Sequence, residues 1–144
     1  MTTKTKYNKN ALKFKRFNTK DGVPATDLYE YEYRTSVIKN PAGDEVFKME
    51  NVEVPKNWSQ VATDILAQKY FRKAGVPLSD GTTGSETSVK QVAHRLADCW
   101  KSWGEKYGYF ASKKDAQVFY DELVYSILGQ MAAPNSPQWF NTGL

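Results

Sequence analysis

The chain has 144 residues, of which 40% are hydrophobic and 14% aromatic, enough to form a domain with its own core. It has no run of about 18 apolar residues, which excludes a membrane span of that kind. The basic, polar beginning of the sequence lacks the apolar segment of a secretory signal, and the single cysteine, Cys99, excludes an internal disulfide. We therefore expect a cytoplasmic protein.

The net charge of +4 is unevenly distributed. The first 20 residues contain six lysines, one arginine and no acidic residue, so the other 124 residues carry a net charge of −3. We expect residues 1–20 to form a basic, disordered tail, although such a segment can also bind nucleic acid or another polyanion. Residues 21–144 are expected to form the folded domain.

Residues 28–51 show the pattern of a β-hairpin. Tyr29, Tyr31 and Tyr33 alternate with charged residues, which places the rings on one face of a strand. A turn cluster of Asn, Pro, Ala, Gly and Asp follows at 40–44, and the alternation resumes over 45–51. An isolated hairpin is marginally stable in water, so we expect this one to pack on another part of the chain.

Three helices are expected after the hairpin, from their apolar periodicity and their capping residues. The first is expected between Asn57 and Gly75. The second is expected to begin at Val89, with Gly104 and Gly108 marking its end, and the third to run from Ser112 to Met131. The loop over 78–85 is rich in Gly, Ser and Thr but lacks the lysine and glycine spacing of a phosphate-binding P-loop, which favours a flexible linker. The predicted fold class is mainly α: a small bundle of three main helices with an N-terminal β-hairpin.

The last fourteen residues, 131–144, differ from the rest. Pro134 and Pro137 prevent the third helix from continuing, so we expect an extended C-terminal end. This end carries Trp139, Phe140 and Leu144, and no later residue is present to cover them. Either the segment folds back onto the bundle, or these side chains form a surface for a partner.

A search for reactive groups in the sequence predicts neither a catalytic residue nor a metal site. His94 and Cys99 are five residues apart on a predicted helix, which separates their directions by roughly 140°. We expect His94 to be a partly exposed polar residue and Cys99 to be a buried, unreactive side chain. A small basic module that binds nucleic acid or a protein partner remains the alternative, although the net charge of −3 outside the first 20 residues makes nucleic acid the less favoured partner.

Several stretches of the chain resemble one enzyme family. They lie at residues 36–41, 52–62, 64–77, 92–98 and 103–110 and, above all, in the block from Gln130 to Leu144, which contains Pro134-Asn-Ser-Pro137. Together they are similar to the amino-terminal region of class II ribonucleotide reductases, which depend on adenosylcobalamin. The resemblance covers nearly everything from Phe14 to Leu144.

The resemblance implies an oxidoreductase that converts ribonucleotides, in this family usually diphosphates, to deoxyribonucleotides by cobalamin-initiated thiyl radical chemistry. It implies that the helical segment flanks a ten-stranded α/β barrel and that the extended C-terminal end leads into that barrel. Ser136 then corresponds to a contact with the nucleotide substrate, and Asn135 is a weaker candidate for the same role. A hydroxyl beside proline can instead stabilise a turn, which is the alternative for Ser136.

The chain also departs from the family pattern in a way that limits its role. The family's chemistry requires several cysteines, and this chain has Cys99 alone, on a helix that precedes the barrel. The resemblance therefore implies a scaffold that is inactive alone, with adenosylcobalamin bound by the remainder of the enzyme. Its expected partners are that remainder and the ribonucleotide substrate, with no membrane.

Overall fold

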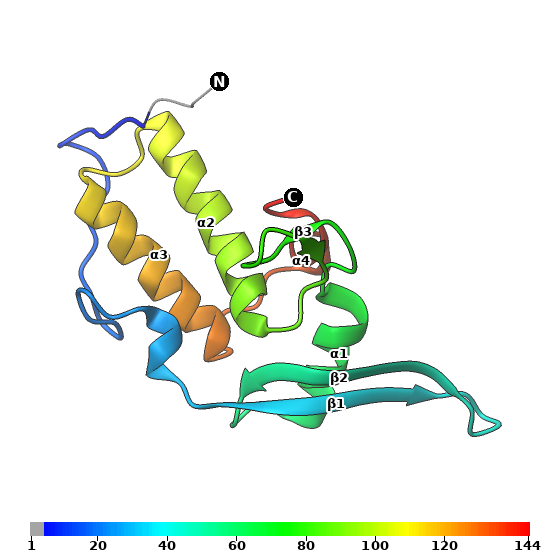
Figure 1. Cartoon of the computed structure of the whole chain (residues 1–144). Helices are drawn as coiled ribbons and strands as arrows, with labels where there is room; N and C mark the ends of the chain where they lie inside the picture. The colour runs from blue at the N-terminus through cyan, green and yellow to red at the C-terminus, as the bar shows by residue number, and fades with distance from the viewer. Residues whose placement is uncertain (1–4) are drawn as a thin grey trace. The chain divides into compact units, whose positions relative to one another are not determined.

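The structure is a computed structural model and describes residues 5–144. Its elements in chain order are η1 (Ala25–Leu28), β1 (Tyr31–Lys39), β2 (Glu45–Pro55), α1 (Gln60–Ile65), η2 (Leu66–Tyr70), β3 (Val76–Pro77), β4 (Thr83–Gly84), α2 (Val89–Tyr107), α3 (Lys113–Leu128) and α4 (Ser136–Asn141) (Figure 1). Of these, η1 is a 3₁₀ helix and η2 is a single π-helical turn.

The chain forms two compact units. The first, the helical unit, contains the chain up to Leu28 together with Ala93–Ala133 and Thr142–Leu144. The second, the hairpin unit, contains Tyr29–Val92 and Pro134–Asn141. Helix α2 begins in the hairpin unit and continues in the helical unit, so the chain passes between the units within one helix.

The expected mainly α class is correct only in part. Four α-helices and two antiparallel two-stranded sheets lie within residues 5–144, which makes the fold mixed. The predicted hairpin and the predicted second and third helices are confirmed, and Ser112 caps α3 as expected, its Oγ accepting from the backbone N–H of Asp115. None of the helices in the described part of the chain has the length and hydropathy to cross a membrane.

The hairpin contains a β-bulge that the sequence analysis did not identify. Arg34 pairs with Val52, but the next pair is Ser36 with Met49, so β2 has one extra residue at this point. Asn51 adopts a left-handed conformation with φ of 58°. Bulges of this kind bend the strand and change which side chains face the core.

The inward face of the hairpin is the polar face of β1. Tyr33 is 68% exposed, whereas Ser36 is fully buried. The buried side chains of Val52 and Val54 share this inward face, because each lies opposite a β1 residue of the polar set. The guanidinium of Arg34 donates to the carbonyl oxygens of Trp58 and Lys56 and to Thr63 Oγ1, so charge on this face is compensated by hydrogen bonds.

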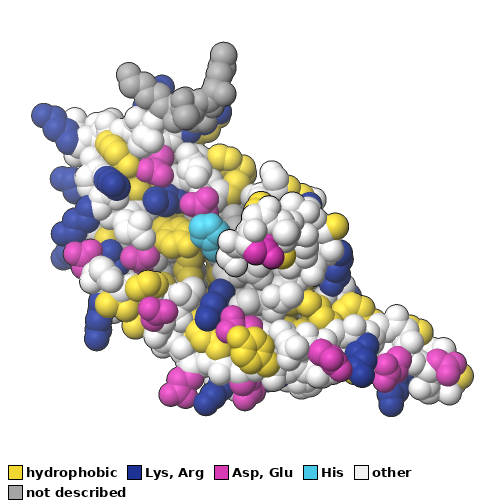
Figure 2. Space-filling model, in the orientation of Figure 1, with side chains coloured by type: hydrophobic (Ala, Val, Ile, Leu, Met, Phe, Trp, Pro, Cys, Tyr) yellow, Lys and Arg dark blue, Asp and Glu magenta, His cyan; other side chains and the backbone are white. Residues whose placement is uncertain are grey.

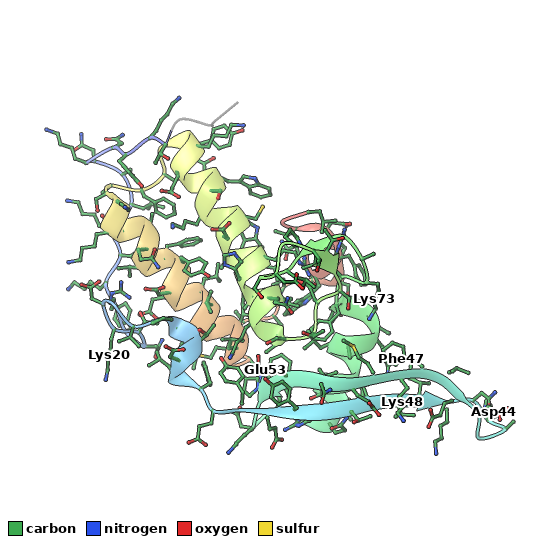
Figure 3. All side chains as sticks on the ribbon, in the orientation of Figure 1. Lys20, Asp44, Phe47, Lys48, Glu53 and Lys73 are labelled. Carbon is green, nitrogen blue, oxygen red and sulfur yellow. The ribbon has the colours of Figure 1, made fainter. Side chains whose placement is uncertain are left out.

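Phe47 lies on the same face of the hairpin, and Lys73 lies on that side of the hairpin (Figure 3). The Nζ atom of Lys73 is 5.2 Å from the centroid of the Phe47 ring, a cation–π distance. The neighbouring side chain, Lys48, is exposed, as the alternation predicts.

The core of the helical unit lies between α2, α3 and the N-terminal segment. Three phenylalanine rings form its aromatic centre: Phe110 and Phe119 have centroids 5.2 Å apart, and Phe14 lies 6.0 and 5.7 Å from them. Of the two glycines expected to mark the end of α2, Gly108 directly follows its last residue and has a φ of 71°, as predicted. Gly104 instead lies inside the helix, where the ring of Phe110 occupies the space that a side chain would need. Met131 lies beyond α3 and is exposed.

Residues 5–20 differ from the expected disordered tail. Leu12 forms a parallel bridge with Phe110: its N–H donates to the carbonyl oxygen of Tyr109, and its own carbonyl oxygen accepts from the N–H of Ala111. Arg16 forms an ion pair with the buried carboxylate of Asp121, with 2.7 Å between Nη1 and Oδ2. Residues 5–20 are held against α3 because acidic side chains of α3 accept hydrogen bonds from the backbone of this segment and from Arg16. Residues 1–4 of the predicted tail lie outside the described residues.

The C-terminal end was expected to be extended, but residues 136–141 form the short helix α4. Pro137 is the second residue of α4, a first-turn position where the missing N–H of proline leaves no intrahelical hydrogen bond unmade. Trp139 is only 9% exposed, whereas Phe140 and Leu144 are exposed at 41% and 65%. The C-terminal end was expected either to fold back onto the rest of the chain or to form a surface for a partner, and Trp139 folds back.

Candidate functional site

Ser136, the predicted substrate contact, is the first residue of α4 and is exposed. Its Oγ atom lies 3.0 Å from the hydroxyl oxygen of Tyr70, and either oxygen could be the donor. Asn135, the weaker candidate, is also exposed and precedes the helix. Its carbonyl oxygen accepts from the N–H groups of Gln138 and Trp139, so the backbone of Asn135 begins the helix.

Tyr70, the partner of Ser136, lies at the end of the first predicted helix. The helix begins later than expected, since Ser59 rather than Asn57 caps it by accepting from the N–H of Ala62 at 3.0 Å. At its end, Phe71 N–H donates to the carbonyl oxygen of Leu66, which is a π turn. Tyr70 is the last residue of this turn.

The ring of Tyr70 also contacts two aromatic side chains of α4. It stacks on Trp139 with centroids 5.2 Å apart and an interplanar angle of 18°. It is tilted against Phe140, with centroids 5.3 Å apart. A six-residue helix is too short to be stable alone, so these contacts stabilise α4. One tyrosine therefore contacts α4 at Ser136, Trp139 and Phe140.

Two charged groups elsewhere in the hairpin unit, the buried Glu86 and the exposed Lys73, form hydrogen bonds to the backbone. Glu86 is 2% exposed, and its carboxylate accepts from the backbone N–H of Arg72 at 2.7 Å. Burial lowers the pKa of Lys73 despite the opposing effect of Glu86, and its ammonium donates to the carbonyl oxygen of Ala67. Both groups form hydrogen bonds to the backbone, which indicates a structural role in joining η2 to the segment before α2.

The predicted loop over 78–85 includes β4, which pairs with β3 just before the loop to form a small two-stranded sheet. The Asp80 carboxylate accepts from the hydroxyl and the backbone N–H of Thr82, and these two hydrogen bonds lower its pKa. The Asp80 carboxylate therefore has its hydrogen-bond donors within the loop.

His94 and Cys99 do not form a site. His94 is exposed, as predicted, and is visible as the single histidine of the surface (Figure 2). Its Nδ1 atom lies 2.7 Å from the hydroxyl oxygen of Tyr120, whose pKa is raised to about 12 by burial and by the charges of Asp98 and Asp121. Cys99 is half-buried rather than fully buried. Among residues 5–144, no three His, Cys, Asp or Glu side chains are grouped so that they could hold a metal ion.

The sequence analysis missed a groove of about 400 Å³ in the helical unit, lined by the chain before and within η1 and by α3. Its buried carboxylate, Asp121, already accepts from Arg16 and from Gln117 Nε2. The groove therefore offers no uncompensated charge to a ligand at Asp121.

Comparison with known proteins places the chain beside one enzyme family. Residues 32–130 match the family model described as class II vitamin B12-dependent ribonucleotide reductase. The vitamin B12-dependent ribonucleotide reductase of Bradyrhizobium diazoefficiens is 47% identical over 92% of this chain and 13% of its own length. The enzymes of the same name from Agrobacterium fabrum and Streptomyces clavuligerus are 43% and 40% identical, again over 92% of this chain and 13% of their own lengths.

Proposed function

Because this chain belongs to the class II vitamin B12-dependent ribonucleotide reductase family and spans about 13% of the length of its curated relatives, we propose that it is the amino-terminal part of such an enzyme. In this role it contributes to the reduction of ribonucleotides, specifically diphosphates, to deoxyribonucleotides. The observation that carries the proposal is the family match over residues 32–130.

The chemistry of the described residues supports a scaffold rather than a reacting centre. Thiyl radical reduction requires a radical cysteine and a further pair of thiols, whereas this chain has only Cys99, half-buried on α2. The reacting thiols and the catalytic barrel would therefore belong to the remainder of the enzyme, which is the proposed partner of this chain. The exposed apolar side chains of Met131, Phe140 and Leu144 are available to such a partner.

The groove of the helical unit does not fit adenosylcobalamin. The groove in the helical unit has a volume of about 400 Å³, at the small end of the range of about 300–1,000 Å³ for drug-sized ligands, and the cofactor is several times larger than such ligands. His94, the single histidine, is engaged with Tyr120. We propose that the cofactor binds to the remainder of the enzyme.

Ser136 is the proposed substrate contact within this chain. It is exposed at the beginning of α4, and its backbone is fixed by Pro137 and by the packing of Trp139. A hydroxyl in this position can donate a hydrogen bond to a phosphate oxygen with little loss of conformational entropy. Asn135 would assist more weakly.

The scaffold role is tested by reconstitution. The purified chain, given a ribonucleoside diphosphate, adenosylcobalamin and a dithiol, should form no deoxyribonucleotide. Adding a polypeptide that carries the rest of a class II reductase should give cobalamin-dependent reduction, with more turnover of diphosphates than of triphosphates. A chain that ends at Gln130 is the control and should restore less activity. Turnover by the chain alone, or no association of the two polypeptides in a pull-down, would contradict the proposal.

A further inference from the structure

We propose that Tyr70 is a positioning residue for the substrate contact: its O–H donates to Ser136 Oγ and so directs the Ser136 O–H toward a phosphate oxygen of the nucleotide. The inference rests on the proposed role of Ser136 in ribonucleotide binding. The observation behind it is the distance of 3.0 Å between the two hydroxyl oxygens, formed by residues that are 66 positions apart in the sequence.

The direction of this hydrogen bond follows from the acidity of the two groups. A phenol is a stronger donor than an aliphatic alcohol, so in a hydroxyl pair the tyrosine preferentially donates and the serine accepts. Ser136 then keeps its own hydrogen for another acceptor. A phosphate oxygen in that place would complete a chain of hydrogen bonds from Tyr70 through Ser136, and each bond of such a chain strengthens the next.

A residue that orients another must itself be held in place, and the side chain of Tyr70 is held in place. Its ring stacks on Trp139, which is 9% exposed, and is tilted against Phe140, so the phenol cannot rotate away without losing both contacts. Tyr70 is the last residue of the π turn η2. An isolated serine at the start of a helix would instead rotate among its rotamers and lose that freedom when it bound substrate.

A purely structural role for Tyr70 makes a different prediction, because stacking depends on the ring and positioning depends on the hydroxyl. Tyr70→Phe keeps the ring and removes the hydroxyl, whereas Tyr70→Leu removes both. Tyr33→Phe is the matched control, since it removes a tyrosine hydroxyl from a ring that is 68% exposed on the hairpin of the same unit.

The variants are compared in the reductase assembled from this chain and the remainder of the enzyme, with a ribonucleoside diphosphate as the substrate. Tyr70→Phe should raise KM roughly threefold to tenfold, the loss expected for one hydrogen bond, with a smaller change in kcat and an unchanged unfolding midpoint. Tyr70→Leu should raise KM and also lower the unfolding midpoint. Tyr33→Phe should change neither quantity.

The double variant decides whether Tyr70 acts through Ser136. If it does, Ser136→Ala and the combined Tyr70→Phe, Ser136→Ala variant should have the same KM, since the tyrosine has nothing left to orient. If the double variant raises KM by the product of the two single effects, Tyr70 acts independently of Ser136 and the inference fails. A Tyr70→Phe variant with the parent KM would also overturn the inference, while leaving the substrate contact in place. If Ser136→Ala itself leaves KM unchanged, the proposed contact fails, which is a separate outcome.

A measurement on the 144-residue chain tests the hydrogen bond without catalysis. In NMR spectra, Tyr70→Phe should shift the Ser136 amide and Cβ signals while the indole signal of Trp139 stays near its original position, because the stack remains. Unchanged Ser136 signals would also overturn the inference.

Discussion

At the scale of single residues, Gly104 shows how a side chain far from the helix backbone sets a sequence requirement. A Cβ atom added at 104 would lie 2.3 Å from Cε2 of Phe110. Phe110 is 3% exposed and its ring is held by Phe14 and Phe119, so it has little space into which to move. Glycine is therefore required here for close packing rather than for ending the helix.

Gly104→Ala combines two opposing effects. Alanine favours a helix interior by about 1 kcal/mol over glycine, but overpacking a core costs about 1–3 kcal/mol. We expect a net destabilisation of roughly 1 kcal/mol, measured as the change in the free energy of unfolding in urea. Ser102→Ala, at an exposed position of the same helix, is the control and should be neutral or slightly stabilising. A stabilised Gly104→Ala variant would contradict the packing of Phe110 on α2.

The Asp115 carboxylate predicts a dependence of stability on pH. Hydrogen bonds from the Ser112 hydroxyl and from the backbone N–H of Phe14 lower its pKa in the folded chain. Because the folded pKa lies below the unfolded one, this contribution is present above the unfolded pKa, about 3.9 for a model peptide, and is lost as the pH falls through the folded pKa.

Asp115→Asn should therefore destabilise the chain at neutral pH and have little effect in acid. The carboxylate is partly exposed, so after solvent screening we expect a loss of about 1 kcal/mol at about pH 7. The difference between variant and parent, followed by urea unfolding across the pH range, should shrink toward about pH 2. An equal difference at both ends of the range would show that the charge is not the cause.

At the scale of elements, the long periodic segments could be predicted and the short ones could not. Helices α2 and α3 carry their signal locally, in apolar spacing and in the Ser112 cap, and the hairpin carries it in alternation around Pro41 and Gly43. Helix α4 depends on its contact with the ring of Tyr70. No local sequence pattern could predict that this ring lies against α4. Ser136 was identified as a candidate by resemblance, whereas its partner Tyr70 became visible only in three dimensions.

The bulge in β2 is an element whose only sequence signal is one residue type. Asn51 has φ of 58°, a region that asparagine tolerates and β-branched residues avoid. Asn51→Gly should change the free energy of unfolding by a few tenths of a kcal/mol, whereas Asn51→Val should lower it by about 1–2 kcal/mol. Glu50→Val, at the neighbouring exposed position, is the control. A parental stability for Asn51→Val would mean that the strand pairs without the bulge.

At the scale of the whole molecule, positive charge is concentrated at the start of the sequence, and folding places part of it next to acidic side chains. Residues 1–20 carry seven positive charges and no negative one. The described part of this segment contacts acidic side chains of α3: Arg16 pairs with Asp121, and the backbone N–H groups of Phe17 and Asn18 donate to Glu122. Figure 2 shows Lys and Arg side chains along the edge of the helical unit where this segment and α3 lie. The basic segment is therefore part of the structure of this unit, although its lysines remain exposed.

The expected basic tail and this contact pattern predict different results for a chain that lacks residues 1–20. A solvated tail would be removed with little change in stability. Here the truncation removes the ring of Phe14 from the aromatic centre and leaves Asp121, which is 5% exposed, without its arginine. Removing one partner of a buried ion pair costs about 3–5 kcal/mol, so we expect at least about 3 kcal/mol of destabilisation, followed by urea unfolding.

The truncation also changes the net charge from +4 to −3, and this effect must be separated from the loss of contacts. Replacing the exposed Lys9, Lys13 and Lys15 by glutamine removes charge but keeps every backbone hydrogen bond, and should change the free energy of unfolding by no more than about 0.5 kcal/mol. Arg16→Gln should reproduce much of the truncation's effect, because it leaves Asp121 buried with Gln117 as its remaining donor. If the lysine variant were as unstable as the truncated chain, charge rather than packing would explain the role of the segment.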